Sequence, residues 1–97
     1  MPLHNHDVPR RNRILARLRD GRCMLCYYIA RGSLPGKVYM PSAYDVHHIH
    51  SRGAGGSWDL TNLICLCRTH HIEYHCGKYK REDLQGILSE EYGYSYE

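Results

Sequence analysis

The sequence predicts a small α+β protein in which a β-hairpin leads into a helix and further helices flank both ends. Two short stretches predicted as strands, residues 44–49 and 63–67, surround a polar turn that contains three glycines. Histidines at helical spacing follow the second stretch, and apolar side chains recur at helical intervals near both ends of the chain. A chain of 97 residues has a modest core, so we expect a structural metal to stabilise it.

We expect residues 1–97 to form a single domain with three parts. Residues 1–22 contain a polar tail and a basic helix. Residues 23–76 contain a metal-binding knuckle and the hairpin with its helix. Residues 77–97 form a C-terminal helix and an acidic tail.

The first helix is expected to carry Ile14, Leu15 and Leu18 along one side and to end at Gly21. Its other faces hold arginines, which form either a solvated surface or a binding surface for phosphates. They are Arg10, Arg11, Arg13, Arg17 and Arg19.

A CxxC motif at Cys23 and Cys26 follows this helix, and Cys67 and His70 form a CxxH motif later in the chain. Together they supply the four ligands of a tetrahedral zinc site. Cys65 is a rival ligand, and the spacing leaves open which of His70 and the histidine after it binds which ion. The chain lacks any segment resembling a signal peptide, so we expect reduced thiols and metal binding rather than disulfides.

The link over residues 27–43 is assigned no chemistry, and a short strand is expected over residues 37–40. Tyr27, Tyr28 and Tyr39 are expected to pack around the small core rather than to stack on nucleic-acid bases.

The central histidines divide naturally between two tasks. His71 and His75 lie four residues apart and therefore on one face of a helix, as two ligands of one metal ion must. His47 and His48 are adjacent in a strand and point to opposite faces. We expect one of them to bind the metal and the other to act as a general base, while the amide of Asn62 braces the loop between the strands.

This central segment resembles the HNH endonucleases, whose site is a ββα-metal (His-Me finger) core. The resemblance rests on VHHI at residues 46–49, SRGAGGS at 51–57, NLICLC at 62–67 and RTHH at 68–71. Members of the zinc-finger type also carry knuckles in the same relation to the hairpin. The resemblance implies that His47 and His71 bind the metal and that His48 is the general base, which Asn62 orients. His75 matches a third ligand that is found in only part of the family.

The implied reaction is metal-dependent hydrolysis of a phosphodiester bond, which nicks or cleaves DNA. His48 would take a proton from the attacking water, and a divalent ion, Mg²⁺, Mn²⁺, Ni²⁺ or Zn²⁺, would stabilise the developing charge. A second ion, Zn²⁺, would be structural. Asp45 is a weaker rival for the first ligand position, and Arg52 and Arg68 are candidate contacts to DNA phosphates.

Charge is distributed unevenly along the chain, although the net charge is only +3. Residues 1–37 carry eight basic and two acidic side chains, whereas residues 82–97 carry five acidic and no basic ones. This distribution suits a nucleic-acid binder. The resemblance implies a DNA partner and a bacterial host cell, and because nothing resembles a signal peptide or a membrane span, we expect no membrane partner and a cytoplasmic location. Similar compact HNH proteins occur in bacteriophages and prophages, which implies packaging or recombination machinery as a protein partner. The alternative function is a noncatalytic zinc-binding module that contacts DNA or another protein.

Overall fold

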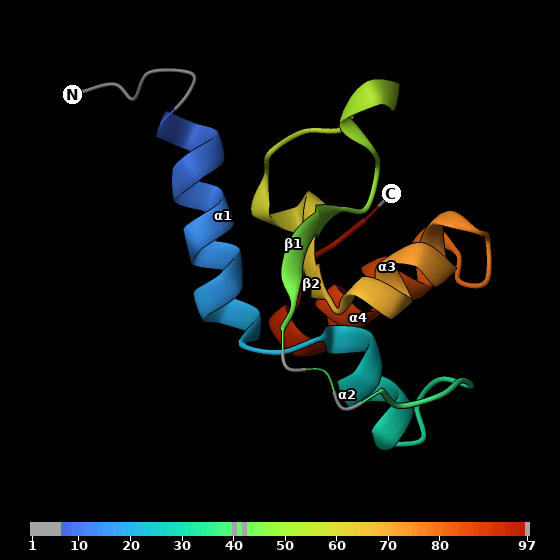
Figure 1. The fold of residues 1–97 in the computed structure, drawn as a ribbon. Helices are drawn as coiled ribbons and strands as arrows, with labels where there is room; N and C mark the ends of the chain where they lie inside the picture. The colour runs from blue at the N-terminus through green and yellow to red at the C-terminus, as the bar shows by residue number, and fades with distance from the viewer. Residues whose placement is uncertain (1–6, 40, 42, 97) are drawn as a thin grey trace.

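The computed structural model describes residues 7–39, 41 and 43–96, so residues 1–6 of the expected N-terminal part lie outside the described residues. Two helices precede the two strands and two follow them, which confirms the predicted α+β class (Figure 1). The elements are α1 (Asp7–Asp20), α2 (Met24–Ala30), β1 (Asp45–His48), β2 (Leu63–Leu66), α3 (Arg68–His75) and α4 (Arg81–Tyr92), with 3-10 turns at Arg52–Ala54 and Leu60–Asn62.

The two strands form the predicted antiparallel hairpin. His47 lies opposite Ile64 and His48 lies opposite Leu63. Successive side chains of a strand alternate between faces, so these two histidines project to opposite sides of the hairpin. All residues of β2 are buried, whereas β1 is exposed or half-buried along its length.

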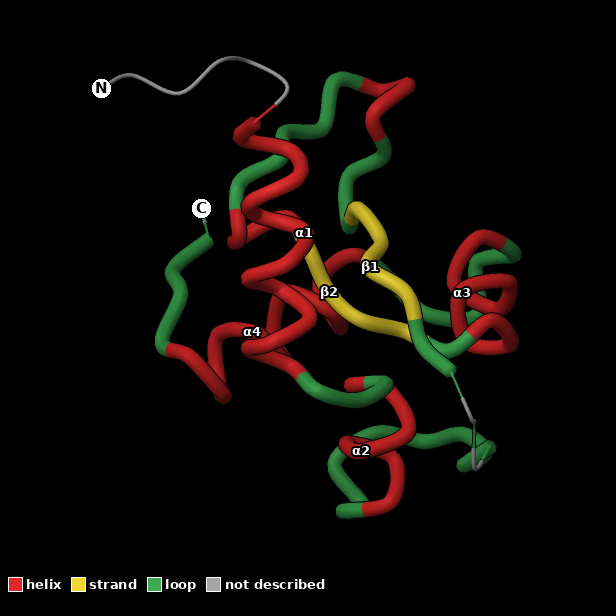
Figure 2. The backbone as a smooth tube through the Cα atoms, turned by 60° about the vertical axis from the view of Figure 1, so that its left-hand side comes forward, coloured by secondary structure: helices red, strands yellow, loops and turns green. Residues whose placement is uncertain are grey.

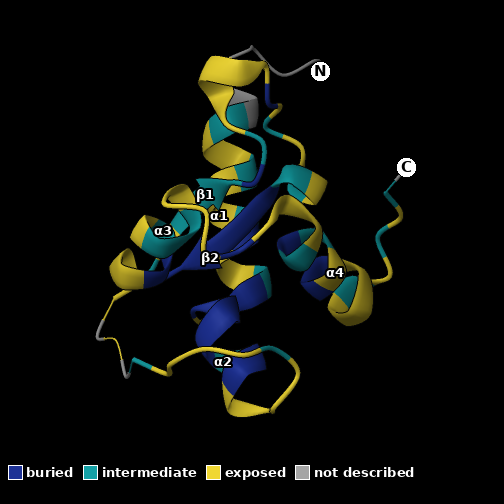
Figure 3. Ribbon diagram, turned by 90° about the vertical axis from the view of Figure 1, so that its right-hand side faces the viewer, coloured by how far each residue is buried: buried dark blue, intermediate teal, exposed yellow. Residues whose placement is uncertain are grey.

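Helices surround the hairpin on several sides. α1 and α3 lie on opposite sides of it, and α2 packs beyond one end of the strands (Figures 1 and 2). The buried residues concentrate in β2, α2 and one face of α4 (Figure 3). This arrangement leaves the helix α3 free to present its histidines toward β1.

The orientation of α1 differs from the prediction. Leu18 is 77% exposed and Ile14 is 52% exposed, while Ala16 and Asp20 are buried. Arg19 determines this orientation, because its guanidinium donates to the carbonyl oxygens of Leu60 at 2.8 Å and Leu63 at 2.6 Å. Pairing these peptide groups outweighs burial of two aliphatic side chains, since unpaired buried carbonyls are costly.

A buried ion pair at the end of α1 is connected to the rest of the chain by hydrogen bonds. The guanidinium of Arg19 lies 2.8 Å from the carboxylate of Asp20, which also accepts hydrogen bonds from the Tyr92 hydroxyl at 2.6 Å and the Cys65 amide at 2.9 Å. Burial opposes the charge of Arg19, but the hydrogen bond and charge of Asp20 raise its pKa overall. Arg19 is therefore not available as a DNA-contacting arginine of the first helix.

The segment after the first cysteine motif also differs from the prediction. Residues 24–30 form the helix α2, whose residues Met24, Leu25 and Tyr28 are almost fully buried. The Cys23 sulfur caps this helix by accepting from the Cys26 amide. The strand expected over residues 37–40 is absent from residues 37–39, and Met40 lies outside the described residues.

The predicted C-terminal helix is present as α4, which buries Leu84, Ile87 and Leu88 in the core. Beyond it, the hydroxyl of Tyr96 donates to the carbonyl of Thr61 at 2.7 Å and returns the chain to the hairpin. Within the described residues, helices are too short or too polar to cross a membrane.

Candidate functional site

Three cysteines and one histidine converge at the junction of α2, β2 and α3. The ligand atoms of Cys23, Cys26, Cys67 and His70 all lie within 4.8 Å of one another, and all four residues are buried. The Nδ1 atom of His70 faces the three sulfurs at 3.4, 3.3 and 3.5 Å, respectively. The two predicted motifs therefore form one cluster, the cysteine site.

The spacing of the cysteine site matches the demands of a tetrahedral metal ion. With bonds of about 2.3 Å to sulfur and about 2.0 Å to nitrogen, tetrahedral ligands have sulfur and nitrogen about 3.5 Å apart. Burial raises the pKa of Cys23 to about 12, so the thiolates need a bound cation to persist in this environment. The site can hold a structural metal, as predicted.

The cysteine site also answers two alternatives left open by the sequence. His70, rather than His71, joins the cysteines. Cys65 lies elsewhere, where its thiol donates to the carbonyl of Ala16 at 3.6 Å. Cys65 lies within β2, whereas Cys67 follows the strand as the N-cap residue of α3, so the turn into the helix separates the two side chains.

A second layer of contacts orients His70. Its Nε2 lies 3.0 Å from the carbonyl oxygen of Lys37, which fixes this nitrogen as the donor and leaves Nδ1 free to bind a metal. Glu73 lies beside the ring and accepts a hydrogen bond from the Tyr39 hydroxyl. Lys37 and Tyr39 come from the link that was assigned no chemistry, so these two contacts were not predicted.

Three further histidines meet between β1 and α3, and we call them the histidine cluster: His47, His71 and His75. The rings of His47 and His71 are stacked with their centroids 3.5 Å apart, and His71 and His75 lie 4.4 Å apart edge to face. Burial, followed by the neighbouring His71, lowers the pKa of His47 to about 4. Neutral imidazoles of this kind are suitable metal ligands.

The histidine cluster is more open than the cysteine site. Among the described residues, only the cysteine site forms a group of three or more side chains that could hold a metal ion. Its ligand atoms all lie within 4.8 Å of one another. Asp45, the rival ligand, shares the strand face of His47, but its side chain is 80% exposed and lies 3.9 Å from Arg17. Asp45 is thus turned toward the first helix and solvent.

His48 projects to the other face of the hairpin, where its ring meets Trp58 edge to face at 4.3 Å between centroids. The Nε2 atom of His48 is buried and has no hydrogen-bond partner among the described residues. Burial, together with the charge of Arg52, lowers the pKa of His48. This side chain is a neutral imidazole with a nitrogen that can accept a proton.

Asn62 holds the loop between the strands closed. Its Oδ1 accepts from the amide of His50 at 2.8 Å, and its Nδ2 donates to the carbonyls of His50 at 3.0 Å and Ser57 at 2.9 Å. Gly56 is packed against the backbone of His50, where a Cβ atom would overlap the carbonyl oxygen. The expected bracing contacts of Asn62 are present, while its role in a reaction stays a prediction.

The candidate DNA-contacting arginines lie on the surface. Arg52 is exposed, donates to the carbonyl of Gly56 at 3.1 Å, and has its guanidinium 5.7 Å from the centre of the Trp58 ring. Arg13 reaches the same ring from α1 at 6.0 Å. Arg68 is exposed at the first residue of α3. Two of these arginines therefore lie near His48 through their shared contact with Trp58.

Comparison with known proteins identifies one relevant similarity. The chain is 30% identical over 63 residues to Anaredoxin of Nostoc sp., an alignment that covers 65% of this chain and 68% of that protein. No protein-family model matches the chain, and no solved structure matches it.

Proposed function

We propose that this chain, which belongs to the same family as Anaredoxin, is a metal-dependent DNA endonuclease with a ββα-metal core. Family membership assigns no reaction here, so the proposal is carried by the histidine cluster. His47 stacks on His71 at 3.5 Å, and His75 lies one turn further along α3, so three imidazoles lie side by side between β1 and α3.

The donor set of the histidine cluster suits a divalent ion that keeps open coordination positions. His47 and His71 would hold the ion, with His75 as a third ligand. A divalent ion bound there supplies a positive charge that stabilises the phosphorane-like transition state and the leaving 3′ oxygen. Asp45 is a weaker candidate ligand because its side chain is directed toward solvent and Arg17.

His48 supplies the general base in this proposal. Its Nε2 has no hydrogen-bond partner among the described residues, and because this atom is buried, a water molecule must enter beside it before it can take a proton. The edge-to-face contact with Trp58 holds the ring in one orientation. A positioned base of this kind contributes about 10²–10⁴-fold to a rate.

Asn62 would act as a positioning residue rather than as a reacting group. Its three hydrogen bonds fix both ends of the glycine-containing loop, from His50 to Ser57, directly after the strand that carries His48. The loop in turn holds Arg52 beside Trp58. We assign Arg52 and Arg68 to phosphate contacts, because both are exposed arginines at the edges of this region.

The cysteine site would hold Zn²⁺ with a purely structural role. Four buried protein ligands close the coordination sphere, and a catalytic zinc site normally keeps one position for water. The metal would join α2, the end of β2 and the start of α3. It would thereby fix the helix that carries His71 and His75.

A plasmid nicking assay tests this proposal. The zinc-loaded protein should convert supercoiled DNA to open circles only when Mg²⁺, Mn²⁺ or Ni²⁺ is added. Binding of the same plasmid should be measured in parallel without added metal. Binding without nicking across all three ions, on both plasmid and single-stranded DNA, would contradict the nuclease and favour a noncatalytic zinc-binding module.

A further inference from the structure

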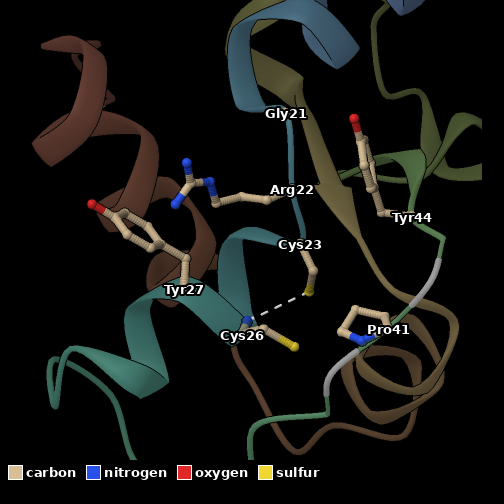
Figure 4. Close-up of a pocket in the computed structure, with 7 residues that line it drawn as sticks. All are labelled: Gly21, Arg22, Cys23, Cys26, Tyr27, Pro41 and Tyr44. Carbon is tan, nitrogen blue, oxygen red and sulfur yellow. Dashed lines mark hydrogen bonds between the residues drawn. The ribbon is translucent and has the colours of Figure 1, made fainter.

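A pocket beside the cysteine site is not used by the proposed reaction. It has a volume of about 330 Å³ and lies between the start of α2 and the segment that leads into β1. Figure 4 shows Tyr27 and Tyr44 on opposite sides of the pocket, with Cys23 and Cys26 between them. This volume falls within the range of pockets that bind small organic groups.

The two tyrosines of this pocket differ from all others in the chain. The protein has nine tyrosines, and the hydroxyls of Tyr27 and Tyr44 have no hydrogen-bond partner among the described residues. The hydroxyl groups of the other seven tyrosines each form a hydrogen bond within the protein. These residues are Tyr28, Tyr39, Tyr74, Tyr79, Tyr92, Tyr94 and Tyr96. Tyrosine hydroxyls usually find partners in a fold, so the unused pair is available to a ligand.

Each pocket tyrosine also carries an arginine over its ring. The guanidinium of Arg22 lies 4.6 Å from the centre of Tyr27, and that of Arg17 lies 4.8 Å from the centre of Tyr44. Within the described residues Arg22 has neither an ion pair nor a hydrogen bond, so its charge is free. Unstacked nucleic-acid bases stack on aromatic rings and on guanidinium planes. Arginines without a protein partner can bind the neighbouring phosphates.

We propose that this pocket binds an unstacked base of the DNA strand a few nucleotides from the phosphate that is cut. The proposal rests on the nuclease function and adds a substrate requirement, a strand with an unpaired base. Tyr44 precedes His47 by three residues, or about 10 Å of extended chain, which corresponds to about three nucleotide rises of a DNA strand. Because the sulfurs of Cys23 and Cys26 are assigned to the structural metal, the tyrosine rings and Arg22 would supply the contacts to the base.

Tyr27 packs against the core as predicted, and this assignment adds a second role to it. Tyr27 is half-buried, contacts Tyr28 edge to face and lines the pocket, while its hydroxyl points away from the two cysteines (Figure 4). Tyr44 is also half-buried, at the start of the hairpin. Packing and base stacking are therefore combined in the same two side chains.

The test measures binding without cutting. Fluorescence anisotropy should follow a labelled single-stranded DNA on zinc-loaded protein without added divalent metal, beside a matched strand whose central nucleotides are abasic. We expect roughly tenfold tighter binding of the strand with bases. Tyr27→Leu and Tyr44→Leu should each remove most of this preference and leave binding of the abasic strand unchanged.

Matched variants separate stacking from folding. Tyr27→Phe and Tyr44→Phe keep the rings and should retain most of the preference, while Tyr96→Leu alters a tyrosine outside the pocket and should behave as the wild type. Zinc content and circular dichroism establish that each variant is folded. If Tyr27→Leu fails to fold, Tyr44→Leu decides the question, because its ring lies outside the central helices.

The outcomes for the pocket and for the nuclease are distinct. Equal binding of normal and abasic strands, or wild-type preference in Tyr44→Leu, would overturn the pocket assignment even if plasmid nicking persists. A base preference that depends on Tyr44 in a protein that never nicks DNA would support the pocket and overturn the nuclease alone. Tighter binding of the matching RNA strand would overturn the assignment to DNA.

Discussion

The imidazole rings of His47 and His71 are stacked, with centroids 3.5 Å apart and 23° between their planes. One ring comes from the strand β1 and the other from the helix α3, so the hairpin and helix must be fixed relative to each other for the stack to exist. The cysteine site lies at the start of α3 and supplies such a constraint. The two clusters are therefore coupled through one helix.

The first prediction concerns metal binding at this stack. Zinc-loaded wild-type protein should bind one further divalent ion, and His71→Ala should weaken that binding by roughly tenfold or more, because loss of even an outer contact of a metal site costs about 10–100-fold. Isothermal titration with Ni²⁺ or Mn²⁺ measures the effect. Ile72→Ala changes the neighbouring, exposed residue and serves as the control. Equal affinities in the two variants would remove His71 from the ligand set.

The second prediction concerns the cysteine site. Cys67→Ala should lose the structural metal and destabilise the fold by at least about 4 kcal/mol, because binding energy at a structural metal site is also folding energy. A chelator should have the same effect on the wild type. Cys76→Ser, at an exposed thiol outside the cluster, should retain both metal and stability. A metal-free Cys67→Ala protein that unfolds at the wild-type temperature would refute this role.

The third prediction concerns the buried pair of Arg19 and Asp20, whose side chains are 11% and 0% exposed. Arg19→Met should cost about 3–5 kcal/mol, because it leaves a buried carboxylate without its positive partner. Urea denaturation measures the cost. Arg17→Met removes a half-exposed arginine from the same helix and should cost less than about 1 kcal/mol. Similar costs for both variants would show that burial of the pair is unimportant.

The fourth prediction concerns the loop that Asn62 closes. Gly56→Ala should destabilise the protein by about 1–3 kcal/mol, because the new methyl group meets the backbone of His50 and Ser51, which cannot move independently. Gly53→Ala is the matched control, since a Cβ there meets no atom within 4 Å. Thermal unfolding and limited proteolysis of the loop report the difference. Equal resistance of the two variants to heat and protease would contradict the tight packing.

Local spacing carried most of the site prediction. The CxxC and CxxH motifs place their ligands on single turns, so Cys23, Cys26, Cys67 and His70 could be grouped before any fold was known. Strand alternation likewise separated His47 from His48, and helical spacing placed His71 beside His75. Such inferences depend only on backbone geometry within one element.

Features that depend on contacts between distant parts of the chain could not be predicted from the sequence. The helix α2 begins at a cysteine cap and is apolar on most sides because it is buried, so it lacks both a usual cap and an amphipathic pattern. Arg19 and Asp20 look like surface residues until their partners in β2 and α4 are known. The exposed positions of Ile14 and Leu18 follow from that same pair.

The most direct measurement is the nicking rate of His48→Gln compared with His50→Gln, in proteins matched for zinc content. His50 lies two residues away and contacts the carbonyl of Ala54 rather than the hairpin face that carries Trp58. We predict that His48→Gln lowers the metal-dependent rate by about 10²–10⁴-fold, the usual contribution of a general base, while His50→Gln stays near the wild type. Equal rates for His48→Gln and the wild type would contradict the proposed nuclease site.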